Sequence, residues 1–484
     1  MRGQRAEDAS APRRGRVKRA LALWLVLFGA YAATLGVDAI QGERFAPREA
    51  HVLLSADAIV SDGFVDLRHE YRDRAWRAFS HRALHPTATP VDGRLVEPQG
   101  LGFPLLVAPA YALGGPVLVE LWLAALLALA FVLGAALGRR LVPEPWASAA
   151  ALVMGLSPPA LAAATAVSPE GAGALALSAG ALAALALRER PRLALAVACA
   201  GAIAAVPWLA VELAGAGAVC AVVLARWLRR RSRGWAALVA LDLVLFSGVL
   251  FVTLHDRLFG GLTPYAASRA PGSATGLDSA GDLVARAPRL VGVWLDRDAG
   301  LLVWAPFAAL AFYAVWLLWR SHRERLAFAV HEQADVEVAA GFLAAICAAQ
   351  AIVAALLAPA LHGAWGPARL LVPVLPLAGA LAAWGLRFAP RAGAALGALT
   401  LAGSVWLLAG ARLGEATLAP PAGDVPWGGA ERVLPRFGGG LSTGAVVCTA
   451  AVAAALAALA AREARGRRRG QRAGVLRVGS RPLE

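Results

Sequence analysis

Residues 13–35, RRGRVKRALALWLVLFGAYAATL, set how the chain begins, because a basic stretch is followed by an apolar run of about twenty residues. A run of this length can cross the hydrocarbon core of a bilayer as a helix. The stretch resembles a signal peptide, but it lacks a convincing A-x-A cleavage site. We therefore expect a retained first membrane span over residues 19–38.

The rest of the chain is equally apolar. Of its 484 residues, 59% are hydrophobic and 16% are charged, and the mean hydropathy is +0.60. Soluble domains are about 45–50% apolar. Hydropathy predicts an all-α, polytopic membrane protein with about twelve transmembrane helices. The predicted spans are residues 19–38, 103–138 (a re-entrant piece and a helix), 147–166, 170–187, 192–207, 208–226, 235–254, 300–319, 338–360, 369–386, 392–411 and 441–461.

The formal net charge of +15 could indicate a nucleic-acid partner. The basic residues, however, gather at the ends of the apolar runs, which is a topology signal and not a binding face, so no nucleic-acid partner is expected. They alternate with weakly charged or long connections. The positive-inside rule then predicts a multi-pass protein of the bacterial cytoplasmic (inner) membrane with both termini cytoplasmic. Residues 1–18 are the expected cytoplasmic N-terminus, and the basic tail 462–484 is expected to be disordered against anionic lipid.

Cysteine and histidine give no sign of a metal centre. All four cysteines lie inside apolar runs and are expected to be small core residues. The sequence has no HExxH or paired CxxC motif, so we expect no cofactor, while a need for a divalent metal stays open.

A polar loop, residues 38–102, interrupts the apolar runs, and its core (42–71) reads GERFAPREAHVLLSADAIVSDGFVDLRHEY. Residues 47–61 start with a proline and keep apolar residues at helical spacing, which predicts a helix lying in the membrane interface. Its apolar face would carry Val52, Leu53, Ile59 and Val60. Residues 61–81 are polar, and we expect Tyr71, Trp76 and Phe79 to be interfacial anchors.

Several short motifs, in order along the chain, resemble the GT-C superfamily of integral-membrane glycosyltransferases. The similarity is to family 39-like proteins related to protein mannosyltransferases and aminoarabinose transferases. The first motif runs from Arg48-Glu49-Ala50-His51 to the Asp62-Gly63 turn, followed by Asp66, Glu70 and Tyr71. The others are PQGLGFPLLVAPAYALGG (98–115), SPEGAGALAL (168–177), LDRDAGLLVWAPF (295–307) and WGPARLLVPVLPL (365–377).

The resemblance implies transfer of a sugar from a polyprenyl-phosphate donor to an extracytoplasmic glycan, lipid or protein acceptor. A loop carboxylate would be the general base, and an arginine would stabilise the departing lipid phosphate. The resemblance makes Glu49 the candidate base and Arg369 the candidate phosphate ligand. The remaining candidates for binding substrate or ordering the loop are Arg48, His51, Asp62, Asp66, Glu70, Tyr71 and Glu170. The site is expected between the first loop, the loop 255–298 and the connection LHGAWGPAR (361–369).

One position departs from the family pattern. Arg48 stands where the family has the loop aspartate that serves as base, and arginine cannot accept a proton at neutral pH. Either Glu49 or another loop carboxylate has taken over, or the protein is a non-catalytic relative that binds lipid-linked sugar or scaffolds an envelope assembly. A transporter is a third alternative.

Each candidate also has a structural explanation. Arg369 could be a snorkelling residue at a helix end, and Glu170 could cap the helix that it begins. Asp296, Arg297 and Asp298 are expected to pair with one another. The intramembrane carboxylates Glu120, Glu212 and Asp242 are expected to snorkel or to form hydrogen bonds between helices.

Overall fold

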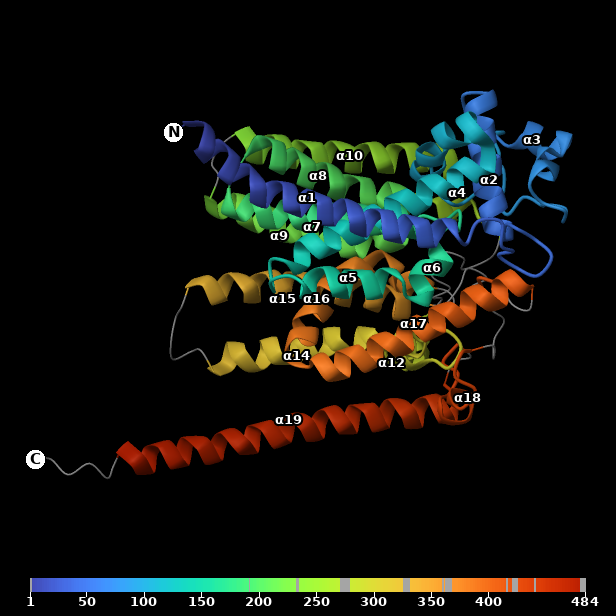
Figure 1. The fold of residues 1–484 in the computed structure, drawn as a ribbon. Helices are drawn as coiled ribbons and strands as arrows, with labels where there is room; N and C mark the ends of the chain where they lie inside the picture. Colours follow the sequence, from blue (N-terminus) through green and yellow to red (C-terminus); the bar gives the residue numbers. More distant parts are fainter. Residues whose placement is uncertain are drawn as a thin grey trace, which may run out of the picture.

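The computed structural model describes residues 2–190, 192–231, 235–269, 279–324, 331–358, 361, 368–414, 417–419, 425–438 and 441–478. Within these ranges the regular structure is helical and no β-strand occurs. The long helices run side by side (Figure 1). They are α1 (Arg2–Ala32), α4 (Gly102–Gly138), α5 (Trp146–Gly155), α7 (Glu170–Glu189), α8 (Leu193–Leu209), α9 (Ala214–Arg231), α10 (Trp235–Phe259), α14 (Ala309–Glu324), α15 (His331–Ile352), α16 (Leu375–Phe388), α17 (Pro390–Leu413) and α19 (Thr443–Val478).

Shorter helices connect or extend the long ones. They are α2 (Pro47–Ser61), α3 (Arg68–Asp73), η1 (Ala75–Ala78), α6 (Pro158–Ala164), η2 (Val211–Leu213), η3 (Pro264–Ala267), α11 (Ala280–Arg286), α12 (Arg289–Leu295), α13 (Leu301–Trp304), η4 (Pro306–Ala308), the π-helical turn η6 (Val353–Leu357), η7 (Arg369–Val374) and α18 (Ala430–Val433).

The chain is an all-α, multi-pass membrane protein. Seven helices in the described residues are long and apolar enough to cross a membrane, or up to eight if α5 and α6, bent by 62°, form one span. Each of the twelve predicted runs overlaps a helix or a group of consecutive helices. The count of about twelve spans itself stays a prediction, because some of these helices are shorter or more charged than a span requires.

The helix α4 is broken where a re-entrant turn was predicted. Gly114 and Gly115 leave helical geometry, and Gly115 has φ 63° and ψ −157°, a conformation open only to glycine. Pro116 follows directly and cannot donate a backbone hydrogen bond to the preceding turn. The break separates a first stretch that packs against α2 from a second stretch within the bundle core.

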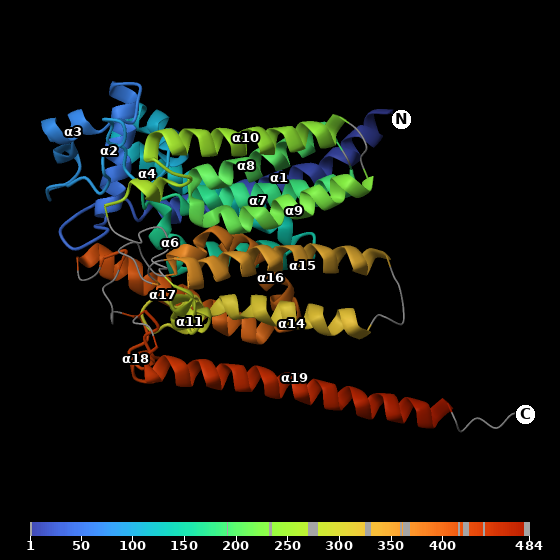
Figure 2. The same ribbon diagram turned by 180° about the vertical axis from the view of Figure 1, so that it is seen from behind.

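The start of α1 and the end of α19 lie at the same end of the bundle, and the first loop lies at the other (Figures 1 and 2). That end also carries Arg139 and Arg140, which follow α4, and Arg188 in the last turn of α7, and it is called the arginine-rich end below. The opposite, loop-bearing end carries α2, α3 and α18.

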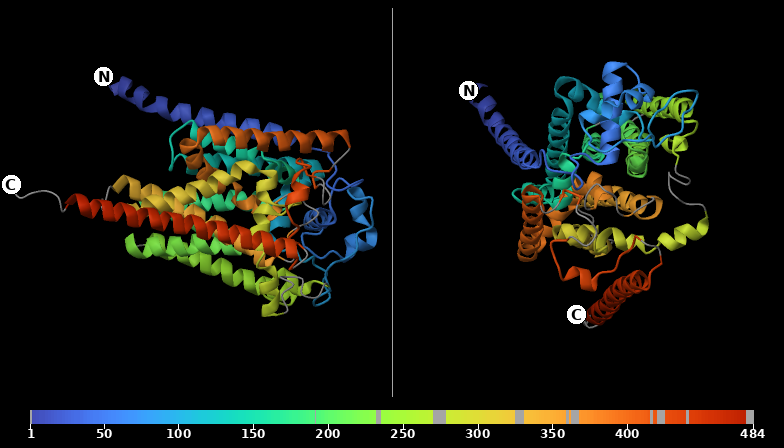
Figure 3. Two further views of the ribbon diagram at one scale, coloured as in Figure 1. Left: turned by 90° about the horizontal axis from the view of Figure 1, so that it is seen from below. Right: turned by 90° about the vertical axis from the view of Figure 1, so that its right-hand side faces the viewer.

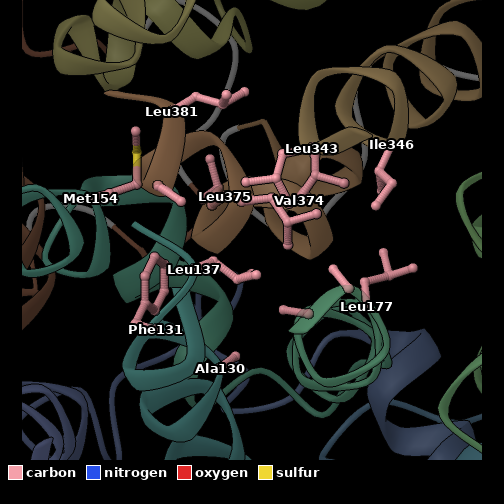
Figure 4. Close-up of a cluster of buried hydrophobic side chains, with 14 of the residues drawn as sticks. Ala130, Phe131, Leu137, Met154, Leu177, Leu343, Ile346, Val374, Leu375 and Leu381 are labelled. Atoms are coloured by element: carbon pink, nitrogen blue, oxygen red, sulfur yellow. The ribbon is translucent and has the colours of Figure 1, made fainter. Parts of the chain in front are cut away.

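The main core lies between the helices in the middle of the bundle. The members of this core include Phe131 and Leu137 on α4, Met154 on α5, Leu177 on α7 and Leu381 on α16, which are labelled in Figure 4. A second apolar cluster holds the first loop onto the first half of α4. Close packing of this kind fixes the loop relative to the bundle.

Two helices bury little of their surface in the protein. The apolar windows of α10 and α19 are 11% and 6% buried, and α19 lies at the edge of the bundle in Figures 1 and 3. A bilayer would cover such surfaces. The helix α19 continues to Val478, which differs from the disorder expected for residues 462–484. Alanine and arginine are strong helix formers, which favours this continuation.

Candidate functional site

The helix α2 lies across the loop-bearing end of the bundle (Figures 1 and 2). Its bounds are those predicted, with Pro47 in the first position, where its missing N–H costs nothing. Its surroundings differ from the prediction of an interfacial helix. Val52 and Leu53 are buried, but Val60 of the same predicted apolar face is exposed, because α2 packs against α4 through its first two-thirds.

The side chain of Glu49 lies in the first turn of α2 and is buried, with 2% of the residue exposed. Its Oε2 accepts a hydrogen bond from the backbone N–H of Ala46 at 2.8 Å, which satisfies one of the free donors at the helix start. Its Oε1 accepts a hydrogen bond from the backbone N–H of Val167 at 3.1 Å. The carboxylate therefore joins α2 to the connection between α6 and α7.

A cavity of about 20 Å³ adjoins this carboxylate. Arg44, Glu49, Glu120 and Thr165 contribute its polar lining. The Arg44 guanidinium forms an ion pair with the Glu120 carboxylate, while the Nε of Arg44 is buried and makes no hydrogen bond. A space of this size with several polar groups around it suits one water molecule or one hydroxyl group.

The burial of Glu49 changes its acidity. Desolvation raises its pKa to about 8, the two backbone N–H groups oppose the rise, and the nearby charges of Glu120 and Glu170 add to it. A carboxyl group with such a pKa exchanges its proton near neutral pH. Groups of this kind occur more often at functional sites than elsewhere.

Arg48 precedes Glu49 but does not line the cavity. Consecutive helical residues point about 100° apart. The residue is exposed, and its carbonyl oxygen accepts a hydrogen bond from Nε2 of Gln99 at 3.2 Å. The positive charge of Arg48 instead lies close enough to His51 and Tyr265 to interact with both side chains.

The buried Glu170 and the half-buried Arg369 form an ion pair across the bundle. Glu170 is the first residue of α7, as predicted, and Arg369 is the first residue of η7. Neither lines the cavity beside Glu49, although the Glu170 charge is close enough to raise the pKa of Glu49. The candidate phosphate ligand thus has a carboxylate partner that the sequence did not reveal.

His51 and Tyr71 belong to a second polar group, centred on the buried Glu97. The hydroxyl of Tyr71 donates to Oε1 of Glu97 at 2.6 Å and lies 2.8 Å from Nδ1 of His51. Thr87 donates to Glu97 through both its backbone N–H and its hydroxyl. Burial lowers the pKa of His51 and raises that of Tyr71, and the Glu97 charge opposes the first shift and adds to the second. These contacts hold the loop together.

The remaining loop carboxylates lie away from the cavity. Asp62 is exposed at the end of α2. Asp66 accepts hydrogen bonds from the Leu95 N–H at 3.1 Å and from Arg68. Partial burial opposes ionisation of Asp66, but these hydrogen bonds outweigh it and lower its pKa. Glu70 on α3 is buried with Oε2 unbonded, and burial raises its pKa.

The predicted anchors of the loop pack inward. Trp76 and Phe79 are buried in the cluster that holds the loop onto α4, and Tyr71 is partly buried against it. Their apolar surface therefore stabilises the loop itself, which differs from the predicted position in the membrane interface.

The other two loops of the predicted site are described only in part. Residues 270–278 and 362–367, with His362 and Trp365, lie outside the described residues. In the described part, the Tyr265 hydroxyl donates to Glu212, which confirms the hydrogen bonding expected of that carboxylate. Arg297 lies 3.6 Å from Asp298, as expected, while Asp296 accepts the backbone N–H of Phe437 at 2.7 Å.

The structure therefore brings together only part of the predicted set. One region contains Glu49, Glu170 and Arg369 together with Arg44 and Glu120. The other candidates lie elsewhere in the first loop. Sequence reasoning did not single out Arg44 or Glu97. A carboxylate inside a span, such as Glu120, requires a partner, and that requirement was the available signal for Arg44.

Among the residues with described positions, no group of three or more His, Cys, Asp and Glu side chains could hold a metal ion. The fold and site thus define an all-α, multi-pass membrane protein with a buried carboxylate and arginine cluster at its loop-bearing end.

Comparison with known proteins finds a distant structural likeness. No family model matches the chain, and no curated protein matches it. The crystal structure of ArnT from Cupriavidus metallidurans bound to undecaprenyl phosphate is similar at 16% sequence identity and a TM-score of 0.47. The match covers 84% of this chain and 72% of ArnT. A likeness this distant establishes neither a shared fold nor a shared activity.

Proposed function

We propose that the chain is a GT-C-type membrane glycosyltransferase that moves a sugar from a polyprenyl-phosphate donor to an extracytoplasmic acceptor. The observation that carries the proposal is the placement of Glu49: a buried carboxyl group with a pKa of about 8 faces a water-sized polar cavity at the loop-bearing end. The motif order along the sequence supplies the reaction class.

In the proposed reaction, Glu49 takes the proton from the acceptor hydroxyl as that oxygen attacks the anomeric carbon of the sugar. The bond from that carbon to the phosphate oxygen breaks, and polyprenyl phosphate leaves. Each oxygen of Glu49 accepts one backbone N–H, so further lone pairs stay available for the acceptor proton. General-base assistance of this kind contributes about 10²–10⁴-fold to the rate.

Arg369 is the proposed ligand of the departing phosphate, since guanidinium groups bind phosphate bidentately. In the absence of donor, Glu170 takes the place of the phosphate on that guanidinium. Arg48, His51, Asp62, Asp66, Glu70 and Tyr71 are proposed to order the loop or to contact the acceptor. The arginine-rich end is proposed to be cytoplasmic, in the bacterial inner membrane.

A non-catalytic role in binding lipid-linked sugar is the second candidate. The observation that favours it is that both oxygens of Glu49 already bond to the backbone, a sufficient structural reason for this residue. In that case Arg48, in place of the family aspartate, would mark the loss of the base.

The two candidates differ in turnover. Purified protein in vesicles is supplied with a radiolabelled polyprenyl-phosphate sugar and a mixture of cell-envelope acceptors. An enzyme releases polyprenyl phosphate and labels an acceptor. Retention of donor without release, together with turnover created by Arg48→Asp, would support the non-catalytic candidate and contradict the first.

A further inference from the structure

A second cavity, of about 290 Å³, opens at the arginine-rich end, far from Glu49. It is lined by Arg140 after α4, by the last turns of α7 and by the first turns of α15. The proposed sugar transfer makes no use of it. The cavity is near the lower end of the size range of small-molecule sites.

Two ion pairs surround the cavity. Arg140 pairs with Glu189, and Arg188 pairs with Asp335 at 2.5 Å. The arginine side chains are 27% and 26% exposed, while those of Glu189 and Asp335 are 58% and 69% exposed. In both pairs the carboxylate is therefore the more exposed partner, and the guanidinium group is the more buried one.

The wall further inside is apolar. Leu185 lies one helical turn before Glu189, and Ala339 lies one turn after Asp335, so both are about 6 Å further into the bundle than the charges. Both are buried. In order of decreasing exposure, the cavity lining presents negative charge, positive charge and apolar surface.

We propose that this cavity binds a zwitterionic phosphoethanolamine head group, as carried by phosphatidylethanolamine. The ammonium group would meet Glu189 and Asp335, and the phosphate would meet Arg140 and Arg188. The glycerol would lie on Leu185 and Ala339. In a membrane lipid the phosphate lies between the glycerol and the ammonium group, which is the order that the cavity presents. A lipid with only a phosphate charge would occupy the two arginines and leave the two carboxylates without partners. A head group with both charges forms charge-assisted hydrogen bonds with all four side chains, and such bonds are stronger than neutral ones.

The test uses the full-length protein purified in detergent. Retention of short-chain phosphatidylethanolamine, phosphatidylglycerol and phosphatidylcholine is measured by native mass spectrometry. Phosphatidylethanolamine should bind most tightly, because the other two lack an ammonium group that donates hydrogen bonds. The double variant Glu189→Gln/Asp335→Asn should weaken phosphatidylethanolamine by about tenfold or more and leave phosphatidylglycerol unchanged or tighter.

Arg140→Gln/Arg188→Gln should weaken all three lipids. Glu144→Gln is the matched control, because Glu144 pairs with Arg139 at the same end without lining the cavity. Ala339→Leu fills the inner wall without changing charge and should reduce retention in protein that elutes as the wild type does.

Both a membrane lipid and a free phosphate ester carry this head group, and competition by soluble phosphoethanolamine distinguishes them. Competition by the soluble compound at concentrations equal to the lipid would support the site and assign it to the free phosphate ester. Equal retention of the three lipids, or unchanged selectivity in Glu189→Gln/Asp335→Asn, would overturn the proposal.

Discussion

The carboxylate of Glu49 accepts a hydrogen bond from the backbone N–H of Val167 across 118 residues of sequence. Through this contact the candidate base holds the first loop onto the connection between α6 and α7. Glu49 therefore has a structural role whether or not it is the general base. Its role as base must be tested by measurements that a purely structural role would not affect.

The raised pKa of Glu49 predicts a pH dependence of stability. Between its ordinary value of 4.5 and about 8, the folded protein holds this proton and the unfolded chain does not. The free energy of unfolding should therefore fall as pH rises through this window, by up to about 1.4 kcal/mol per pH unit from this group. Glu49→Gln cannot ionise and should lack this component. Thermal unfolding of both proteins from pH 5 to 8 measures it; parallel curves would refute the shift.

The ion pair between Arg44 and Glu120 predicts coupled effects on stability. Arg44→Gln leaves the buried Glu120 carboxylate without its cation and should destabilise the protein by about 1–3 kcal/mol. Glu120→Gln in the same chain removes the uncompensated charge and should recover part of that loss. A double-mutant cycle of unfolding free energies measures the coupling, and strict additivity would contradict direct pairing.

Arg369 and Glu170 give a test of the phosphate ligand. Arg369→Gln should raise the KM for the lipid donor, because the guanidinium that binds phosphate is gone. Glu170→Gln removes the carboxylate that competes with phosphate, so the KM should stay the same or fall. Steady-state kinetics with varied donor separate the two. If both variants raise the KM equally, the pair is structural and Arg369 does not bind the phosphate.

The break in α4 depends on glycine at one position. A side chain at Gly115 would meet no neighbour, but its backbone conformation, at φ 63° and ψ −157°, excludes other residues. Gly115→Ala should lower the free energy of unfolding by about 1–3 kcal/mol. Gly201→Ala is the control, because Gly201 lies within α8 with open space around it and ordinary backbone angles. Similar unfolding curves for the two variants would contradict this account.

Local patterns predicted the helices well. Length and apolarity located the runs of the bundle, Pro47 fixed the start of α2, and a re-entrant piece was predicted within residues 103–138, where α4 is broken. Each of these signals acts within a few residues of the chain, so a single sequence is enough to interpret it.

The contacts of the candidate site could not be predicted in the same way. Glu49 meets Val167, and Arg369 meets Glu170, only because helices distant in sequence pack in one particular register. Periodicity shows which face of a helix is apolar but not which neighbour covers it. The burial of α2 illustrates this, since its sequence suits a membrane interface and its surroundings are protein.

Sugar transfer as a function of pH tests the central claim most directly. Wild-type protein, Glu49→Gln and the exposed-loop control Asp73→Asn are compared in vesicles with a polyprenyl-phosphate sugar. The wild-type and control rates should rise with pH, reach half of their maximum near the pKa of about 8 and level off above it, while Glu49→Gln should lose about 10²–10⁴-fold and show no such rise. Transfer by Glu49→Gln at the wild-type rate and with the wild-type pH profile would contradict the assignment of Glu49 as the base.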